Sequence, residues 1–419
     1  INGSYYPDNR ITKVSIDGKD ITYTYDSFGR LVKRGMTTLG SDFSENYTYG
    51  GTTNTTNNDI VQFSIISDFD TTTESFTYDA NRNITSRTIG SQNVTHYEYD
   101  KLDRLIREDN YYEDFTKVYS YDNNGNRTKE KVYWYSPDVA IESLGSYNAR
   151  IAYSYNGSKL MTVTKYNGND VITSSQNISN YDLSGNPCNY KNNMLQWSRG
   201  NRLTAFGNNT YVYNSDGIRI KKTVGNVVHD YFVEGEKIVG EKIGDQEISY
   251  LYDLTGITGI KTGPSESQLY FFQKNVLGDI IAIVDWLGNI VARYYYDAWG
   301  NHRVSITNGV DNDNHIGRIN PFRYRGYYFD SETGLYYLNA RYYDPTTGRF
   351  ISADDSQYLE PDSIFGLNAY AYCYSNPVMY SDTSGHLAIS TIIIGVLIGL
   401  VTTGIKDYIN DGNLFNGDI

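Results

Sequence analysis

The segment from Gly334 to Asp355 ends on two adjacent carboxylates, Asp354 and Asp355, after a run that is rich in tyrosine and turn residues. Two carboxylates brought close together cannot both ionise cheaply, so one keeps a proton and the pair can supply a general base and a general acid. Such a pair can hydrolyse a peptide bond. The structural alternative is that these aspartates cap turns, since Asp is among the commonest turn residues.

The other chemical motifs indicate no cofactor and no metal. The run from Asp311 to Asn314 lacks the glycine and the distal glutamate of a calcium loop. The sequence has no glycine-rich phosphate loop and no GxSxG nucleophile, and Cys188 and Cys373 show no CxxC spacing. No HExxH motif or paired ligand spacing is formed by the five histidines, which are His96, His229, His302, His315 and His386.

The composition excludes one class of partner. The formal net charge is -13 over 419 residues, and no stripe of Lys and Arg is present, which argues against nucleic acid. The 43 tyrosines suit half-buried pleated sheets, where the ring packs and the hydroxyl reaches water. Near Ile1 the sequence lacks the charged and apolar regions of a signal peptide, and we expect an internal piece of a longer protein.

The elements that must position the carboxylates are repeats with Tyr-Asp at their centre. In the copy around Thr24, Tyr23 and Tyr25 alternate with a period of two, which places both rings on one strand face. Asp26 and Gly29 then suit the first and fourth positions of a type I turn, so each unit is a β-hairpin. We expect the hairpins to stack into one long, coiled antiparallel sheet. Copies begin at Thr24, Thr77, Glu98, Ser120, Val212 and Tyr295.

These hairpins resemble the YD repeats of the Rhs family, which includes bacterial polymorphic toxins, the C components of Tc toxins and the teneurins. Asn275 to Gly300 and Asn320 to Asp355 are very similar to the Rhs-associated core, the most distinctive block of the family. The resemblance covers the chain from Tyr23 to Gly385. It implies an all-β spiralling sheet that forms a hollow shell, closed by the core around a variable C-terminal passenger, which an aspartyl autoprotease cuts free.

The resemblance also assigns roles to individual residues. Arg341, in Ala-Arg-Tyr-Tyr-Asp-Pro, matches the arginine that the family places near its catalytic carboxylates. Asp354 matches the first catalytic aspartate, and Asp382, in NPVMYSDTSG, matches the second. Asp355 stands where the family usually has proline and Asp362 lies between the two matched acids, so both are alternative candidates.

The C-terminal part changes character after the core. The family often ends its core with Gly-Leu, whereas this chain has Gly385-His386-Leu387, which places the scissile bond near His386 and Leu387. Residues 387–405 carry no charge and are long enough for a transmembrane helix with a GxxxG pattern. An apolar start of the passenger, held inside a shell, explains the same composition, and both interpretations stay open.

Together these observations predict three parts: a YD-repeat shell segment at 1–270, an Rhs core with the autoprotease motif at 271–386, and the start of the passenger or a membrane segment at 387–419. The predicted function is a bacterial toxin shell, secreted or on the cell surface, that encloses and cuts its own C-terminal polypeptide without a cofactor. An export system or cell wall and an immunity protein are the further expected partners. The alternative is a non-catalytic adhesion scaffold at the cell surface, teneurin-like in role.

Overall fold

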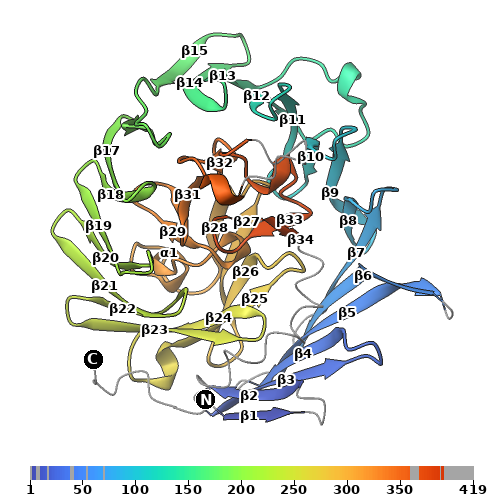
Figure 1. Cartoon of the computed structure of the whole chain (residues 1–419). Helices are drawn as coiled ribbons and strands as arrows, with labels where there is room; N and C mark the ends of the chain where they lie inside the picture. Colours follow the sequence, from blue (N-terminus) through green and yellow to red (C-terminus); the bar gives the residue numbers. More distant parts are fainter. Residues whose placement is uncertain are drawn as a thin grey trace.

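The computed structural model of the chain describes residues 2–5, 10–16, 18–37, 42–52, 55–68, 71–358, 368–386 and 388–390. The structure is 57% strand and 5% helix, which confirms the predicted all-β class. The strands follow one another around the molecule in sequence order, and the last elements of the chain lie in the middle (Figure 1).

The first large sheet has 15 antiparallel strands, each of which pairs with its neighbours in sequence. Register shifts recur next to the turns, as between Thr24 and Tyr25, and such bulges strengthen the local twist of the sheet. The strands are β1 (Asn2–Tyr5), β2 (Ile11–Ile16), β3 (Lys19–Tyr25), β4 (Leu31–Thr37), β5 (Asp42–Thr52), β6 (Thr55–Ser67), β7 (Thr71–Tyr78), β8 (Ile84–Ile89), β9 (Gln92–Tyr99), β10 (Leu105–Asn110), β11 (Phe115–Tyr121), β12 (Arg127–Trp134), β13 (Ala149–Asn156), β14 (Lys159–Asn167) and β15 (Ile172–Asn177).

The second large sheet has 13 strands in the same meandering order, so the expectation of one long sheet is wrong: the strand pairing breaks between β15 and the strand that follows it. The second sheet runs without interruption across residue 270, and the predicted division of the chain at that point stays a prediction. The strands are β16 (Asn189–Tyr190), β17 (Asn193–Ser198), β18 (Arg202–Phe206), β19 (Asn209–Tyr213), β20 (Arg219–Val224), β21 (Val227–Glu234), β22 (Lys237–Ile243), β23 (Gln246–Asp253), β24 (Gly256–Lys261), β25 (Leu269–Lys274), β26 (Ile280–Asp285), β27 (Ile290–Tyr296) and β28 (His302–Ile306).

Two small sheets lie between the large ones, near the centre of Figure 1. Neither large sheet closes on itself, so the closed, hollow shell expected from the family stays a proposal. The small sheets comprise β29 (Tyr328–Asp330), β30 (Leu335–Leu338), β31 (Arg341–Asp344) and β32 (Arg349–Phe350), and then β33 (Tyr380–Asp382) and β34 (Ala388–Ser390). The helical turns are α1 (Ile316–Ile319) and the 3-10 turns η1 (Ile141–Ser143), η2 (Glu266–Gln268), η3 (Tyr324–Gly326), η4 (Ser356–Tyr358) and η5 (Cys373–Ser375).

The predicted turn chemistry is confirmed at the repeats. The Gly29 N–H donates to the Asp26 carbonyl at 3.0 Å, and the Asp26 side chain accepts from the N–H of Arg30 at 2.9 Å. Gly29 has φ +82°, a left-handed conformation that glycine adopts without strain. The tyrosine before each turn donates its hydroxyl to a backbone carbonyl of the preceding repeat, as for Tyr25 to Ile11, Tyr78 to Ile60, Tyr99 to Ile84, Tyr121 to Leu105 and Tyr296 to Ile280.

The central elements are anchored to the second sheet by buried ion pairs. Arg219 of β20 contacts both oxygens of Asp330, at the end of β29, at 2.6 and 3.0 Å, and Lys222 adds a third contact at 2.9 Å. Burial by itself would raise the pKa of Asp330, but the two cations hold that pKa below its usual value. The anchor fixes the small sheet that carries the candidate site.

Candidate functional site

The candidate site forms where two segments of the central elements meet. Arg341 begins β31, and Asp382 ends β33 before the chain turns through Gly385 into β34. Gly385 has φ +82°, and a Cβ there would collide with the carbonyl oxygen of Leu338. Glycine is therefore required for the turn to lie against β30 and β31.

Arg341 is the centre of the site. Its side chain is buried, and its Nη2 lies 2.8 Å from Asp354 Oδ2 and 3.7 Å from Asp382 Oδ2. It also donates to the carbonyls of Gly385 and of Ala369, the latter at 3.0 Å. Burial lowers the pKa of Arg341 to about 10, against the pull of the two carboxylates, so the guanidinium stays charged at neutral pH. One cation therefore holds both predicted acids.

Asp382 is buried and faces the turn that leads into β34. Its Oδ1 accepts hydrogen bonds from the N–H groups of Ser384 at 3.2 Å, Gly385 at 2.7 Å and His386 at 3.2 Å. Its own N–H donates to the Tyr327 hydroxyl at 2.8 Å. Burial raises the pKa of Asp382, although Arg341 and the N–H donors oppose this effect. Burial thus shifts Asp382 toward its neutral form.

Asp354 binds the other side of the same turn. Its Oδ1 lies 2.7 Å from Nδ1 of His386, and its N–H donates to the Ala369 carbonyl at 2.8 Å. The His386 ring also stacks on Tyr358, with centroids 4.1 Å apart and planes 20° from parallel. His386 is therefore held by Asp354 through its side chain and by Asp382 through its backbone. Sequence reasoning placed His386 at the cleavage region but missed these contacts, because no motif signals them.

The alternative acids do not join this cluster in the described part of the chain. Asp355 is exposed, and its Oδ1 accepts from the Gln357 N–H at 3.3 Å, which is a turn-capping contact. Asp362 and Leu387 lie outside the described residues. The structure thus brings together Arg341, Asp354 and Asp382 with His386, while their catalytic role stays a prediction.

The arrangement offers acid–base chemistry. Across the described ranges, no group of three or more His, Cys, Asp or Glu side chains is placed to hold a metal ion. Within those same ranges no helix is long and apolar enough to span a membrane, and the 387–405 segment, apart from 388–390, lies outside them. Two carboxyl groups beside a peptide segment, one of them with a raised pKa, can supply both a proton donor and a proton acceptor.

Comparison with known proteins supports the resemblance drawn from the motifs, although no family profile matches the chain. The chain is 33% identical to the tRNA nuclease WapA of Bacillus subtilis (strain 168) over 298 residues, which are 69% of this chain and 12% of that protein. It is 33% identical to the double-stranded DNA deaminase toxin A of Burkholderia cenocepacia (strain H111) over 133 residues, 30% of this chain and 8% of the toxin. The chain therefore spans a small part of these relatives.

The fold matches solved toxin structures. The crystal structure of TcdB2-TccC3 without its hypervariable C-terminal region superposes with a TM-score of 0.58 at 18% sequence identity. The match covers 91% of this chain and 21% of that one. The likeness extends from the repeats through the central elements. The chain belongs to the Rhs/YD-repeat family, whose members include polymorphic toxins.

Proposed function

We propose that the chain is the shell segment of an Rhs-type toxin that surrounds its own C-terminal polypeptide and cuts it near His386 or Leu387. The single observation that carries the proposal is that Asp354 and Asp382 share the guanidinium of Arg341 and both bind His386. Asp382 contacts the backbone of the turn that we propose is cut, and Asp354 contacts the His386 side chain, so both carboxyls lie beside that segment, as an intramolecular peptidase requires.

The roles of the two acids follow from their surroundings. Asp382, whose pKa is raised by burial, holds the proton and donates it to the scissile carbonyl oxygen as water attacks the carbon. Asp354 accepts the proton of that water. The tetrahedral intermediate then collapses, the C–N bond breaks, and the nitrogen leaves as an amine with the proton that Asp354 took up. Arg341 keeps the negative charge of the pair compensated throughout.

The substrate is tethered, which lowers the demand on the catalytic groups. A bond in the same chain is attacked unimolecularly, so one slow turnover for each molecule is sufficient. The wider setting of the proposal is secretion or delivery to a target cell. The related toxins support a passenger and component partners, and we propose in addition an export system or the cell wall and an immunity protein for the passenger.

The test is to express the chain with a reporter fused after Ile419 and to measure intact mass and the bands on a denaturing gel. We expect the parent chain to be cut near His386, and Asp354→Asn and Asp382→Asn to stay whole, because each removes one proton-transfer group, worth about 100- to 10,000-fold in rate. Asp355→Asn is the matched control, since this neighbouring acid is exposed. Identical bands from the parent and both variants would contradict the protease and leave the adhesion scaffold as the alternative.

A further inference from the structure

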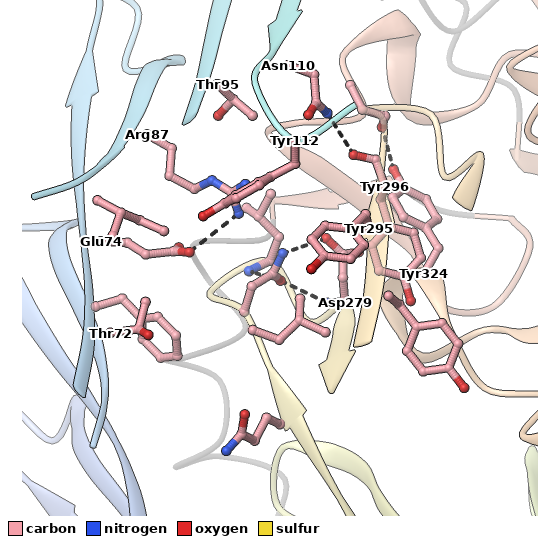
Figure 2. A pocket seen from close by; sticks show the side chains of 18 of the residues that line it. Thr72, Glu74, Arg87, Thr95, Asn110, Tyr112, Asp279, Tyr295, Tyr296 and Tyr324 are labelled. Carbon is pink, nitrogen blue, oxygen red and sulfur yellow. Dashed lines mark hydrogen bonds and ion pairs between the residues drawn. The ribbon is translucent and has the colours of Figure 1, made fainter. Parts of the chain in front are cut away.

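A cavity of about 330 Å³ lies between the first sheet and the central end of the second. Its walls come from β6 to β9 on one side and from β25 to β27 on the other, as Figure 2 shows. Phe63, Phe76 and Tyr97 of the first sheet belong to the same buried hydrophobic cluster as Tyr324. The cavity is at the small end of the size range of ligand sites.

Polar atoms without partners point to a ligand for this cavity. Oε2 of Glu74, Nε of Arg87 and Oγ1 of Thr95 are buried and have no hydrogen-bond partner among the described residues. Glu74 is 6% exposed and Thr95 is 3% exposed, and both line the cavity. The Glu74–Arg87 ion pair, 3.5 Å from Oε1 to Nη1, leaves these other atoms unused. Buried polar groups in folded proteins are normally paired, so a missing partner is indicated.

The lining defines the chemistry of that partner. A free carboxylate oxygen and a free guanidinium N–H lie on one wall, and together they match the N–H and C=O of an amide group. Glu74 and Arg87 compensate each other's charge, so an uncharged ligand fits best. The rest of the lining is mixed: apolar residues such as Ile84, Ile281 and Val378 occur together with the charged residues Asp279, Arg293, Asp297 and Arg325, of which Asp279 and Arg325 lie 3.7 Å apart as an ion pair. These features fit the backbone of a polypeptide segment that carries no charge.

The register of the last hairpin brings such a polypeptide to the cavity. Ser390 pairs with Tyr380 in the antiparallel β33–β34 ladder, so the chain leaves β34 beside the residues that precede Tyr380. Val378, two residues before Tyr380, lines the cavity. The sulfur of Met379, between them, accepts from the N–H of Ile84 at 3.2 Å. Ser390, the last described residue, therefore pairs with a residue two positions from the cavity-lining Val378.

We infer that this cavity binds the polypeptide that follows Ser390, with Glu74 and Arg87 pairing to one of its backbone amides. The inference rests on the proposed function, in which this polypeptide is the enclosed passenger. Residues 391–405, TIIIGVLIGLVTTGI, carry no charge, and their apolar side chains suit Ile84, Ile281 and Val378 in the wall. The cavity holds the first part of the passenger against the wall.

The experiment places a photo-crosslinking residue in the wall. Thr72, labelled in Figure 2, is half-buried and lines the cavity, so Thr72→benzoylphenylalanine brings the probe to the site. The same change at the fully exposed Leu183 is the control. Both are made in the full chain with Asp354→Asn, irradiated, and digested for mass spectrometry. We expect cross-links from position 72 to residues 391–405 within one chain, and none from position 183.

Two further variants test the chemistry of the wall. Glu74→Leu removes the acceptor and is expected to abolish the cross-link, whereas Glu74→Gln keeps an acceptor oxygen and is expected to retain it. No cross-link to residues 391–405, or cross-links only between chains, would overturn the inference. The parent chain reports separately on cutting near His386. Cross-links without cutting support passenger binding in the cavity and overturn the proposed autoproteolysis. Cutting without cross-links supports autoproteolysis and overturns passenger binding in the cavity.

Discussion

Replacing Arg341 by methionine tests whether one buried cation holds the candidate site together. Arg341 is 2% exposed, and its Nη2 contacts Asp354 and Asp382 at 2.8 and 3.7 Å. Methionine fills similar space without charge, so Arg341→Met leaves two carboxyls buried side by side and two carbonyl acceptors without their donor. Removal of one partner from a buried ion pair costs about 3–5 kcal/mol, and we expect a loss of that size in the free energy of unfolding at pH 7.

The pH dependence of this loss provides the sharper test. Without the cation, the two acids repel each other, and at least one folded-state pKa rises above the value in the unfolded chain. The folded variant then binds more protons than the unfolded chain between those two pKa values, so its stability falls as pH rises through the folded pKa. The deficit should therefore shrink on acidification, by about 1.4 kcal/mol for each pH unit over which one extra proton is bound.

The measurement is urea-induced unfolding, followed by tryptophan fluorescence, at pH 7 and at pH 5. Samples are matched by intact mass, so that cut and uncut chains are not compared. Arg303→Met is the control, because the Arg303 side chain is half exposed and its ion pair with Glu113 should contribute little. A deficit for Arg341→Met no larger than that of the control, or one that is equal at both pH values, would refute the reasoning.

Two further predictions concern the cutting reaction. His386→Phe keeps a ring to stack on Tyr358 but loses the contact with Asp354. We therefore expect slower release of the reporter, while the unfolding curve in urea stays unchanged. An unaltered release rate would show that His386 does not contribute to cutting. Chain refolded from urea into a series of buffers should lose its cutting rate as pH rises through the raised pKa of Asp382, because the proton donor is then ionised. A rate that increases steadily with pH would contradict Asp382 as the acid.

Much of the fold could be predicted from the sequence because its causes are local. Alternating tyrosines fix which strand face is buried, and the Asp-x-x-Gly turns fix where each hairpin reverses, as at Asp26 and Gly29. The hydrogen bond from the Tyr25 hydroxyl to the Ile11 carbonyl could not be predicted, because it depends on how one repeat stacks on the next. Closure of the sheets was expected from the family but is not seen. Closure depends on pairing between strands at opposite edges of a sheet, which lie far apart in sequence, so a local pattern does not predict it.

The candidate site divides in the same way. Arg341, Asp354 and Asp382 were nominated because they match the order of the Rhs family motif. The choice between Asp354 and Asp355 could not be made from the sequence, because neighbouring residues in extended chain point to opposite sides. Only the contact with Arg341 shows which of the two turns inward.

The sequence by itself therefore determined the hairpins and the all-β class, because period-two alternation and turn residues act over a few positions, whereas the candidate acids came from the resemblance to the Rhs family. The tertiary structure alone decided that β31 and the turn before β34 meet, that His386 bridges the two acids, and that polar atoms of β7 to β9 without a hydrogen-bond partner in the described part of the chain belong to the same cavity lining as Val378. Those relations join residues far apart in sequence, and they exist only once the large sheets have wrapped around the central elements.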